Sequence, residues 1–279
     1  MLKKLFVTAT CALVIAACAQ SPTGRRQIML FNDAELGKMG AQTFETMKAE
    51  TPIAKDIKLN SYVKCVANSL LAVTPDNLRA QSWEVVVFDS DQVNAFALPG
   101  GKIGVYTGLL KVAQNQEQLA AVVGHEIAHV IAGHSNERLS TNQGIQTILA
   151  LGDAGMKAYG VKYQQELMTA FGLGAQLGVA LPFSRAHETE SDIIGLELMA
   201  KAGFEPREAV NLWQNMAALG SAGTPEFMST HPLPETRIKE LREKLPAAIL
   251  SGAGEAPAGT TPDMASHKDL RAHIERAGL

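Results

Sequence analysis

Two histidines and a glutamate in the middle of the chain have the spacing of a metal-binding helix. His125, Glu126 and His129 fit the pattern HExxH inside an apolar, helix-forming run. On an α-helix, residues four apart lie about 40° apart on one face, so the two imidazoles can bind one metal ion. Glu126 lies about 100° around the helix from His125, beside the position of a metal-bound water. This arrangement is typical of a site that uses one Zn²⁺ per chain to activate water.

The residues before this pattern help to decide between a metal site and an ordinary buried helix. HExxH has only three fixed positions, and a histidine in an apolar helix is more often a hydrogen-bonded core residue than a ligand. Asn115 offers an N-cap with Gln118 three residues later, and apolar periodicity follows, which predicts a buried helix. Ionisable side chains deep in such a helix cost free energy unless a partner satisfies them. A bound metal supplies that partner.

A later helix offers the third protein ligand that a zinc hydrolase needs. The all-histidine extension HExxHxxGxxH is absent, because Ala132 and Ser135 occupy its last two fixed positions. On a helical wheel of residues 184–199, Glu188 and Asp192 share one stripe. We expect Glu188 to bind the zinc and Asp192, one turn on, to hold a ligand imidazole. A solvated helix face with ordinary surface acids is the competing interpretation.

Three segments before the HExxH helix have the composition of strands: 83–88, 93–98 and 102–106. They predict a small antiparallel β-meander beside the helix, with a Pro-Gly-Gly turn between the last two strands. An edge strand here would let an extended substrate add itself by backbone hydrogen bonds. A purely structural hairpin is the alternative.

The motifs, and their order along the chain, resemble those of the HtpX, LoiP and BepA type of metallopeptidase, which is related to the CAAX prenyl proteases. The resemblance covers roughly residues 25–246 and also rests on the segments 94–103 and 229–232 and on Arg237. It implies an α+β, mostly α-helical, zincin-like domain of the gluzincin class, an endopeptidase. It also implies a role for each matching residue: zinc binding by His125, His129 and Glu188, catalytic base for Glu126, and substrate-binding edge strand for Asn94, Ala95 and Phe96.

His231 and Arg237 are further candidates for catalysis. The residue before a proline favours an extended conformation, so we expect His231, which precedes Pro232, to project from a loop. It either donates a hydrogen bond to the oxyanion of a tetrahedral intermediate, binds the zinc and holds the enzyme latent, or is an ordinary loop residue. Arg237, one turn into the next helix, either stabilises the same charge or pairs with an acid.

The amino terminus has the features of a bacterial lipoprotein precursor. A basic start is followed by an apolar run from Leu5 to Ala17, shorter than the roughly 20 residues that cross a bilayer. The run ends in a sequence that resembles a lipobox, so we expect cleavage before Cys18 and lipidation of Cys18. Ala19, by resemblance to sorting rules, favours the periplasmic face of the outer membrane. An ordinary signal peptide is the alternative.

The predicted organisation has four parts: a lipoprotein signal peptide (1–17), a lipidated tether (18–31), a metallopeptidase domain (32–250) with a helical lid insertion (135–183), and a flexible tail (251–279). The lid prediction depends on two helix-forming segments, of which the second is rich in Gly and Ala. A plain pair of core helices is the alternative. BepA-like relatives carry a tetratricopeptide domain after the protease, for which the tail leaves no room.

Composition and the family resemblance limit the partners. A net charge of −3 and the absence of a basic run argue against nucleic-acid binding. Cys65 is the one cysteine left after processing, which excludes an internal disulfide, and we expect it to be buried as a small hydrophobe. The resemblance implies cleavage of misfolded or unassembled envelope proteins and contact with outer-membrane assembly machinery. An assembly factor that binds strands in the same cleft with little proteolysis is the alternative.

Overall fold

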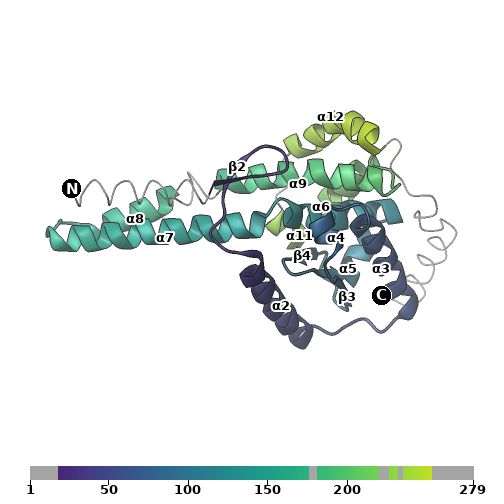
Figure 1. Ribbon diagram of the computed structural model, residues 1–279, viewed down its shortest axis with the longest axis horizontal. Helices are drawn as coiled ribbons and strands as arrows, with labels where there is room; N and C mark the ends of the chain where they lie inside the picture. The colour runs from purple at the N-terminus through teal and green to yellow at the C-terminus, as the bar shows by residue number, and fades with distance from the viewer. Residues whose placement is uncertain (1–17, 176–180, 220–225, 232–234, 253–279) are drawn as a thin grey trace. The chain divides into compact units, whose positions relative to one another are not determined.

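The computed structural model describes residues 18–175, 181–219, 226–231 and 235–252, which form two compact units (Figure 1). We call residues 1–32 and 132–187 the hairpin unit, and residues 33–131 and 188–279 the core unit. The predicted signal peptide, residues 176–180 of the predicted lid and residues 253–279 of the predicted tail lie outside the described residues. No helix among the described residues has the length and apolar composition needed to cross a bilayer.

The hairpin unit contains two long helices that run side by side, α7 (His134–Ala158) and α8 (Gln164–Ala175) (Figure 1). A small antiparallel pair, β1 (Cys18–Gln20) and β2 (Arg26–Ile28), precedes them in the chain, and β2 packs on α7. Cys18 therefore lies in a strand. The predicted tether is in this way tied to a helix more than a hundred residues further along the chain.

A buried carboxylate, Glu137, holds this unit together. Its Oε1 atom accepts a hydrogen bond from Arg25 Nη1 at 2.5 Å. Its Oε2 atom accepts from Arg25 Nη2 at 2.7 Å and from Gln27 Nε2 at 2.9 Å, and lies 3.0 Å from His187 Nε2. The ring of His134 stacks on that of His187, with centroids 4.1 Å apart. We refer to these five residues as the Glu137 cluster.

The core unit contains a mixed sheet and the remaining helices. Before the sheet, its described helices are α2 (Asp33–Glu50), α3 (Ile57–Leu71) and α4 (Asp76–Arg79). After the sheet, they are α5 (Thr107–Val112), α6 (Gln116–Ile131), most of α9 (Leu181–Lys201), α10 (Glu208–Leu219), α11 (Glu226–Thr230) and α12 (Glu235–Gly252). Its strands are β3 (Glu84–Phe88), β4 (Ala95–Leu98) and β5 (Lys102–Tyr106). The predicted fold class, α+β and mostly helical, is confirmed.

The sheet has the order β3-β5-β4 and differs in one respect from the predicted antiparallel meander. β4 and β5 form the expected antiparallel hairpin, and Gly100 and Gly101 in its turn have φ of 84° and 75°, values that glycine adopts without a steric penalty. β3, however, pairs with β5 in parallel. Ile53 bridges the outer side of β3 at Phe88, so among the described strands β4 is the open edge.

Two close approaches position the elements around the site. Four aromatic rings, those of Phe44, Phe88, Phe96 and Tyr106, pack together where α2 meets the sheet. α6 and α9 meet at glycines: a Cβ on Gly195 would lie only 3.1 Å from the backbone nitrogen of His125. The missing side chain lets α9 come close enough to α6 for its acids to contact the histidines.

One burial prediction is wrong. Cys65 on α3 is exposed, not buried. The buried face of α3 is a narrow stripe that contains Val63, Val66 and Leu70, and Cys65 lies beside it. Apolar periodicity alone does not show where such a stripe ends.

Candidate active site

α6 brings His125, Glu126 and His129 into the core unit and begins as the sequence predicts. Asn115 Oδ1 accepts a hydrogen bond from the backbone N–H of Gln118 at 2.8 Å, which satisfies one of the free donors at the start of the helix. His125 and Glu126 are 2% and 4% exposed. Both side chains are therefore held in the interior by a helix that is buried along nearly its whole length.

The predicted zinc ligands converge on one point. The Nε2 atoms of His125 and His129 lie 3.1 Å apart. Glu188, on α9, places Oε2 at 3.3 Å from His125 Nε2 and Oε1 at 3.5 Å from His129 Nε2. Two imidazoles and one carboxylate, with a further position left for water, form the ligand set of catalytic zinc sites. The donor set therefore fits Zn²⁺.

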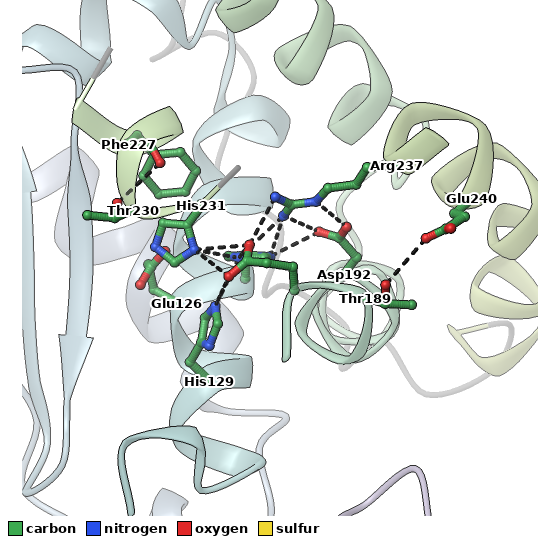
Figure 2. A network of polar contacts seen from close by, with 11 residues as sticks. Glu126, His129, Thr189, Asp192, Phe227, Thr230, His231, Arg237 and Glu240 are labelled. Carbon is green, nitrogen blue, oxygen red and sulfur yellow. Dashed lines mark hydrogen bonds and ion pairs between the residues drawn. The ribbon is translucent and has the colours of Figure 1, made fainter. Parts of the chain in front are cut away.

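His231 belongs to the same cluster of potential ligands. Its Nδ1 lies 3.3 Å from His125 Nε2 and 3.0 and 3.1 Å from the two oxygens of Glu188. Ligand atoms of all four residues lie within 4.8 Å of one another. Figure 2 shows His231 just after α11, beside Glu126 and on the same side of the site as His129. His231 directly follows α11, in a bend outside the helix as predicted, and its N–H donates to Phe227 O at 2.8 Å.

Asp192 and Arg237 surround the ligands with fixed charges (Figure 2). Asp192 Oδ1 lies 3.0 Å from His125 Nδ1, the nitrogen that faces away from His129. Arg237 donates to Asp192 through Nε at 2.6 Å and through Nη2 at 2.8 Å, and its Nη1 lies 2.9 Å from Glu188 Oε2. Arg237 is thus the ion-pair partner of two buried acids. A carboxylate that fixes the orientation of a ligand imidazole is a common feature of zinc sites.

These contacts set the protonation of the cluster. Burial alone would raise the pKa of Glu188, but hydrogen bonds from His125 and His231 hold that pKa far below its usual range. Burial by itself would lower the pKa of His125. The carboxylates of Asp192 and Glu188 outweigh this effect and raise the pKa to about 9. An imidazolium must lose its proton before it binds a metal, so metal binding to this site releases a proton.

Glu126 has the opposite environment. Burial raises its pKa above the ordinary value, and nearby histidines only partly oppose this. No donor among the described residues makes a hydrogen bond to its Oε1 atom, and His231 Nε2, 3.3 Å away, is not in hydrogen-bonding geometry. A backbone hydrogen bond from Ala97, on β4, also acts to lower the pKa of Glu126. Glu126 is therefore a carboxylate with one oxygen available to a reacting group.

The residues predicted to bind substrate lie at the start of the open edge strand. Asn94 accepts from the Tyr106 N–H through its carbonyl at 3.1 Å, and its Oδ1 accepts from the Ala95 N–H at 2.9 Å. Ala95 is buried, and Phe96 packs in the aromatic cluster. β4 packs against α6, and Ala97 reaches Glu126. A substrate beside the ligand cluster would therefore meet the backbone of β4 rather than its side chains.

The sequence did not identify two aromatic residues of this region as part of the site. Trp213 lies over the guanidinium of Arg237, and Phe227 stacks on His231 with centroids 4.5 Å apart. The only signal for Trp213 was its place on the apolar side of a helix, which is the same signal that any core residue gives.

Comparison with known proteins agrees with this geometry. The model of peptidase family M48 matches residues 58–245, more than half of the chain. The chain is 39% identical over 189 residues to the mitochondrial metalloendopeptidase OMA1 of Schizosaccharomyces pombe, which covers 67% of the chain and 53% of the relative. It is 34% identical over 213 residues to OMA1 of Arabidopsis thaliana (76% and 41%) and 29% identical over 211 residues to the β-barrel assembly-enhancing protease of Yersinia pestis (74% and 43%). The chain spans about half the length, or less, of these relatives.

The predicted localisation, lipid-anchored through Cys18 at the bacterial outer membrane, is wrong. The relatives with the higher identities are mitochondrial enzymes, which does not support a bacterial outer-membrane lipoprotein. The prediction depended on a basic start, a short apolar run and one cysteine. Such segments are addresses read by other proteins, so their residue types are a weak guide to the compartment.

Proposed function

The chain belongs to peptidase family M48, and we propose that it hydrolyses internal peptide bonds of unfolded or unassembled proteins. Membership of this family confirms the predicted enzyme class, zinc metalloendopeptidase, and the predicted cofactor, Zn²⁺. The observation that carries the proposal is Glu126, a buried carboxylate with an available oxygen beside a converging set of zinc ligands.

The side chains divide the chemistry between them. His125, His129 and Glu188 would hold the zinc, which when bound polarises a carbonyl and lowers the pKa of water toward about 7. Glu126 accepts the proton of the attacking water and returns it to the leaving amine. Burial raises the pKa of Glu126, which makes this carboxylate a stronger base than an ordinary glutamate and therefore suited to take up the proton of the water.

His231 has two open roles, and the contacts favour one of them. Its Nδ1 lies among the ligand atoms of Glu188 and His125, which supports a zinc-binding role that keeps the enzyme latent. A hydrogen bond to the oxyanion would require this ring to turn away from the zinc ligands. We therefore propose that His231 leaves the ligand cluster when substrate binds.

The open edge of β4 supports an extended substrate. A peptide that adds to this edge, near the predicted substrate-binding residues Asn94, Ala95 and Phe96, would bind through main-chain hydrogen bonds, largely without regard to its sequence. Such binding requires an unpaired, extended segment, which unfolded or unassembled proteins expose. This supports a role in protein quality control, and the relative from Yersinia pestis carries β-barrel assembly in its name.

The finer type within the family is also part of the proposal. The motifs resemble the HtpX, LoiP and BepA type, and the bacterial relatives that match include the β-barrel assembly-enhancing protease of two species. The alternative of an assembly factor with little proteolysis is not favoured, because the matched relatives are named as proteases and endopeptidases.

Cleavage of an unfolded protein tests the proposal. The full chain in detergent, loaded with zinc, is incubated with casein, and the new peptide ends are identified by mass spectrometry. We expect internal cleavage by the wild type and by the control Glu117→Gln, on the same helix outside the ligand cluster, and none by Glu126→Gln. Products that differ from casein only at its ends would indicate an exopeptidase, and binding without cleavage by the wild type would favour the assembly factor.

A further inference from the structure

Trp213, on α10, lies behind the ligand cluster and contacts three parts of it. The guanidinium carbon of Arg237 is 4.1 Å from the centroid of the indole ring. The ring of His125 meets the indole edge to face, with centroids 5.9 Å apart and planes at 79°. Phe227, which stacks on His231, lies 5.5 Å from the indole. Trp213 itself is 3% exposed and contacts neither the ligand atoms nor the open edge of β4 in any of these interactions.

The indole contact matters because Arg237 uses its two surfaces differently. The edge of the guanidinium carries the N–H groups, and these are directed to Asp192 and Glu188. Its face carries no donors, and this face lies on the indole. An arginine can stack on an aromatic ring while it donates in its own plane to carboxylates. The indole therefore restricts rotation of the guanidinium plane, which the two acids alone would leave less fixed.

The orientation of Arg237 in turn assigns the carboxylate oxygens. Nη1 contacts Oε2 of Glu188, which also lies 3.3 Å from His125 Nε2, and Oε1 is directed at His129 and His231. Nε takes Oδ2 of Asp192, and Oδ1 faces His125 Nδ1. Nη2 also donates to Oδ1 of Asp192 at 2.8 Å, so the guanidinium bonds both oxygens of Asp192 and Oε2 of Glu188. A guanidinium that rotated out of this plane would lose its contacts with two buried acids that face the ligand cluster.

We propose that Trp213 is a positioning residue for the zinc site: by holding the guanidinium of Arg237 flat, it fixes the ligand oxygen of Glu188 and the Asp192 support of His125. This inference rests on the zinc site proposed above. Residues that support metal ligands in this indirect way typically change metal affinity by 10–100-fold when they are replaced. An apolar side chain without a π face would fill the space and leave the guanidinium free to turn.

Zinc affinity is the direct test, measured by competition with a chromogenic chelator on the folded metal-free chain. We expect Trp213→Leu to weaken zinc binding roughly 10–100-fold and Trp213→Phe, which keeps a ring face, to weaken it less. Trp83→Leu is the matched control, because Trp83 donates through Nε1 to Leu78 O at 2.8 Å, before β3 and outside the ligand cluster formed by His125, His129, Glu188 and His231. If Trp213→Leu does not unfold cooperatively, Trp213→Met carries the same test. Wild-type zinc affinity in either folded variant would overturn the proposal.

A double-mutant cycle separates positioning from general packing. Arg237→Gln and the pair Arg237→Gln/Trp213→Leu are compared in the same assay. If Trp213 acts through Arg237, the second substitution adds little to the loss caused by the first. Losses that multiply in full would show that Trp213 acts independently and would overturn the proposed route. Absence of zinc binding in the wild type would instead overturn the proposed function.

Discussion

Glu126 and Glu137 lie on consecutive helices and are both buried, yet their surroundings are opposite. Both oxygens of Glu137 have donors, from Arg25, Gln27 and His187. Burial would raise its pKa, but these donors outweigh burial and lower the pKa to about 2. Glu126 has no donor in hydrogen-bonding geometry at Oε1 among the described residues, and burial raises its pKa.

This difference separates a structural carboxylate from a reactive one. A carboxylate with donors on both oxygens is stabilised as an anion and is a poor base. Glu137 therefore joins β2 and α7 within the hairpin unit and takes no proton in the physiological range. Glu126 keeps its basicity because its environment withholds donors, which is an arrangement that costs stability and is found at functional sites. The residue type is the same, and the neighbours decide the role.

The largest expected effect is that of Glu126→Gln on cleavage. Loss of the base should reduce kcat by on the order of 10³-fold or more, while the free energy of unfolding stays close to that of the wild type or rises, because an unsatisfied buried charge is removed. Casein cleavage and urea unfolding of the same preparations check both parts. If the variant lost activity and also unfolded at a much lower urea concentration, Glu126 would be a structural group like Glu137.

Arg25→Ala should produce the reverse pattern. It removes one partner of a buried ion pair and leaves Glu137, which is 1% exposed, with an uncompensated charge, so the free energy of unfolding should fall by about 3 kcal/mol. Arg26→Ala is the matched control, since Arg26 is the next residue of the chain and is exposed. Equal urea midpoints for the two variants would contradict the role given to the Glu137 cluster.

Lowering the pH should also weaken the contribution of Glu137 to the free energy of unfolding, by less than Arg25→Ala does. The pKa of Glu137 is lower in the folded state, so the unfolded state binds a proton first as the pH falls. The stabilisation is fully present above the ordinary glutamate pKa of about 4.5 and is lost as the pH falls toward about 2. Between pH 5 and pH 3 the loss should be roughly 2 kcal/mol. Glu137→Gln should flatten this part of the stability profile, and an unchanged slope would refute the assignment.

The sequence predicted those parts of the site that depend on helical spacing. His125, Glu126 and His129 follow from one helix with a recognisable cap, and Glu188 and Asp192 from a second helix with an inward stripe. In each case the relevant neighbours lie within a few residues along the chain, where helical geometry is fixed.

Features that depend on distant contacts were not predictable in this way. Arg25 meets Glu137 across 112 positions, and neither residue carries a local signal of the other. The parallel pairing of β3 with β5 is decided by how the chain crosses the sheet, which strand composition does not encode. Trp213 gave no sign of its contact with Arg237, because an apolar helix face does not reveal what covers it. The same limit explains the wrong prediction for Cys65.

Zinc content tests the central claim most directly. The wild type, Glu126→Gln and His129→Ala are dialysed against a weak chelator, and zinc per chain is measured by mass spectrometry. We expect one zinc per chain in the wild type and in Glu126→Gln, because Glu126 is not a ligand, and loss of zinc from His129→Ala. A wild type without zinc, or His129→Ala with a full complement of zinc, would contradict the assignment of this cluster as the metal site.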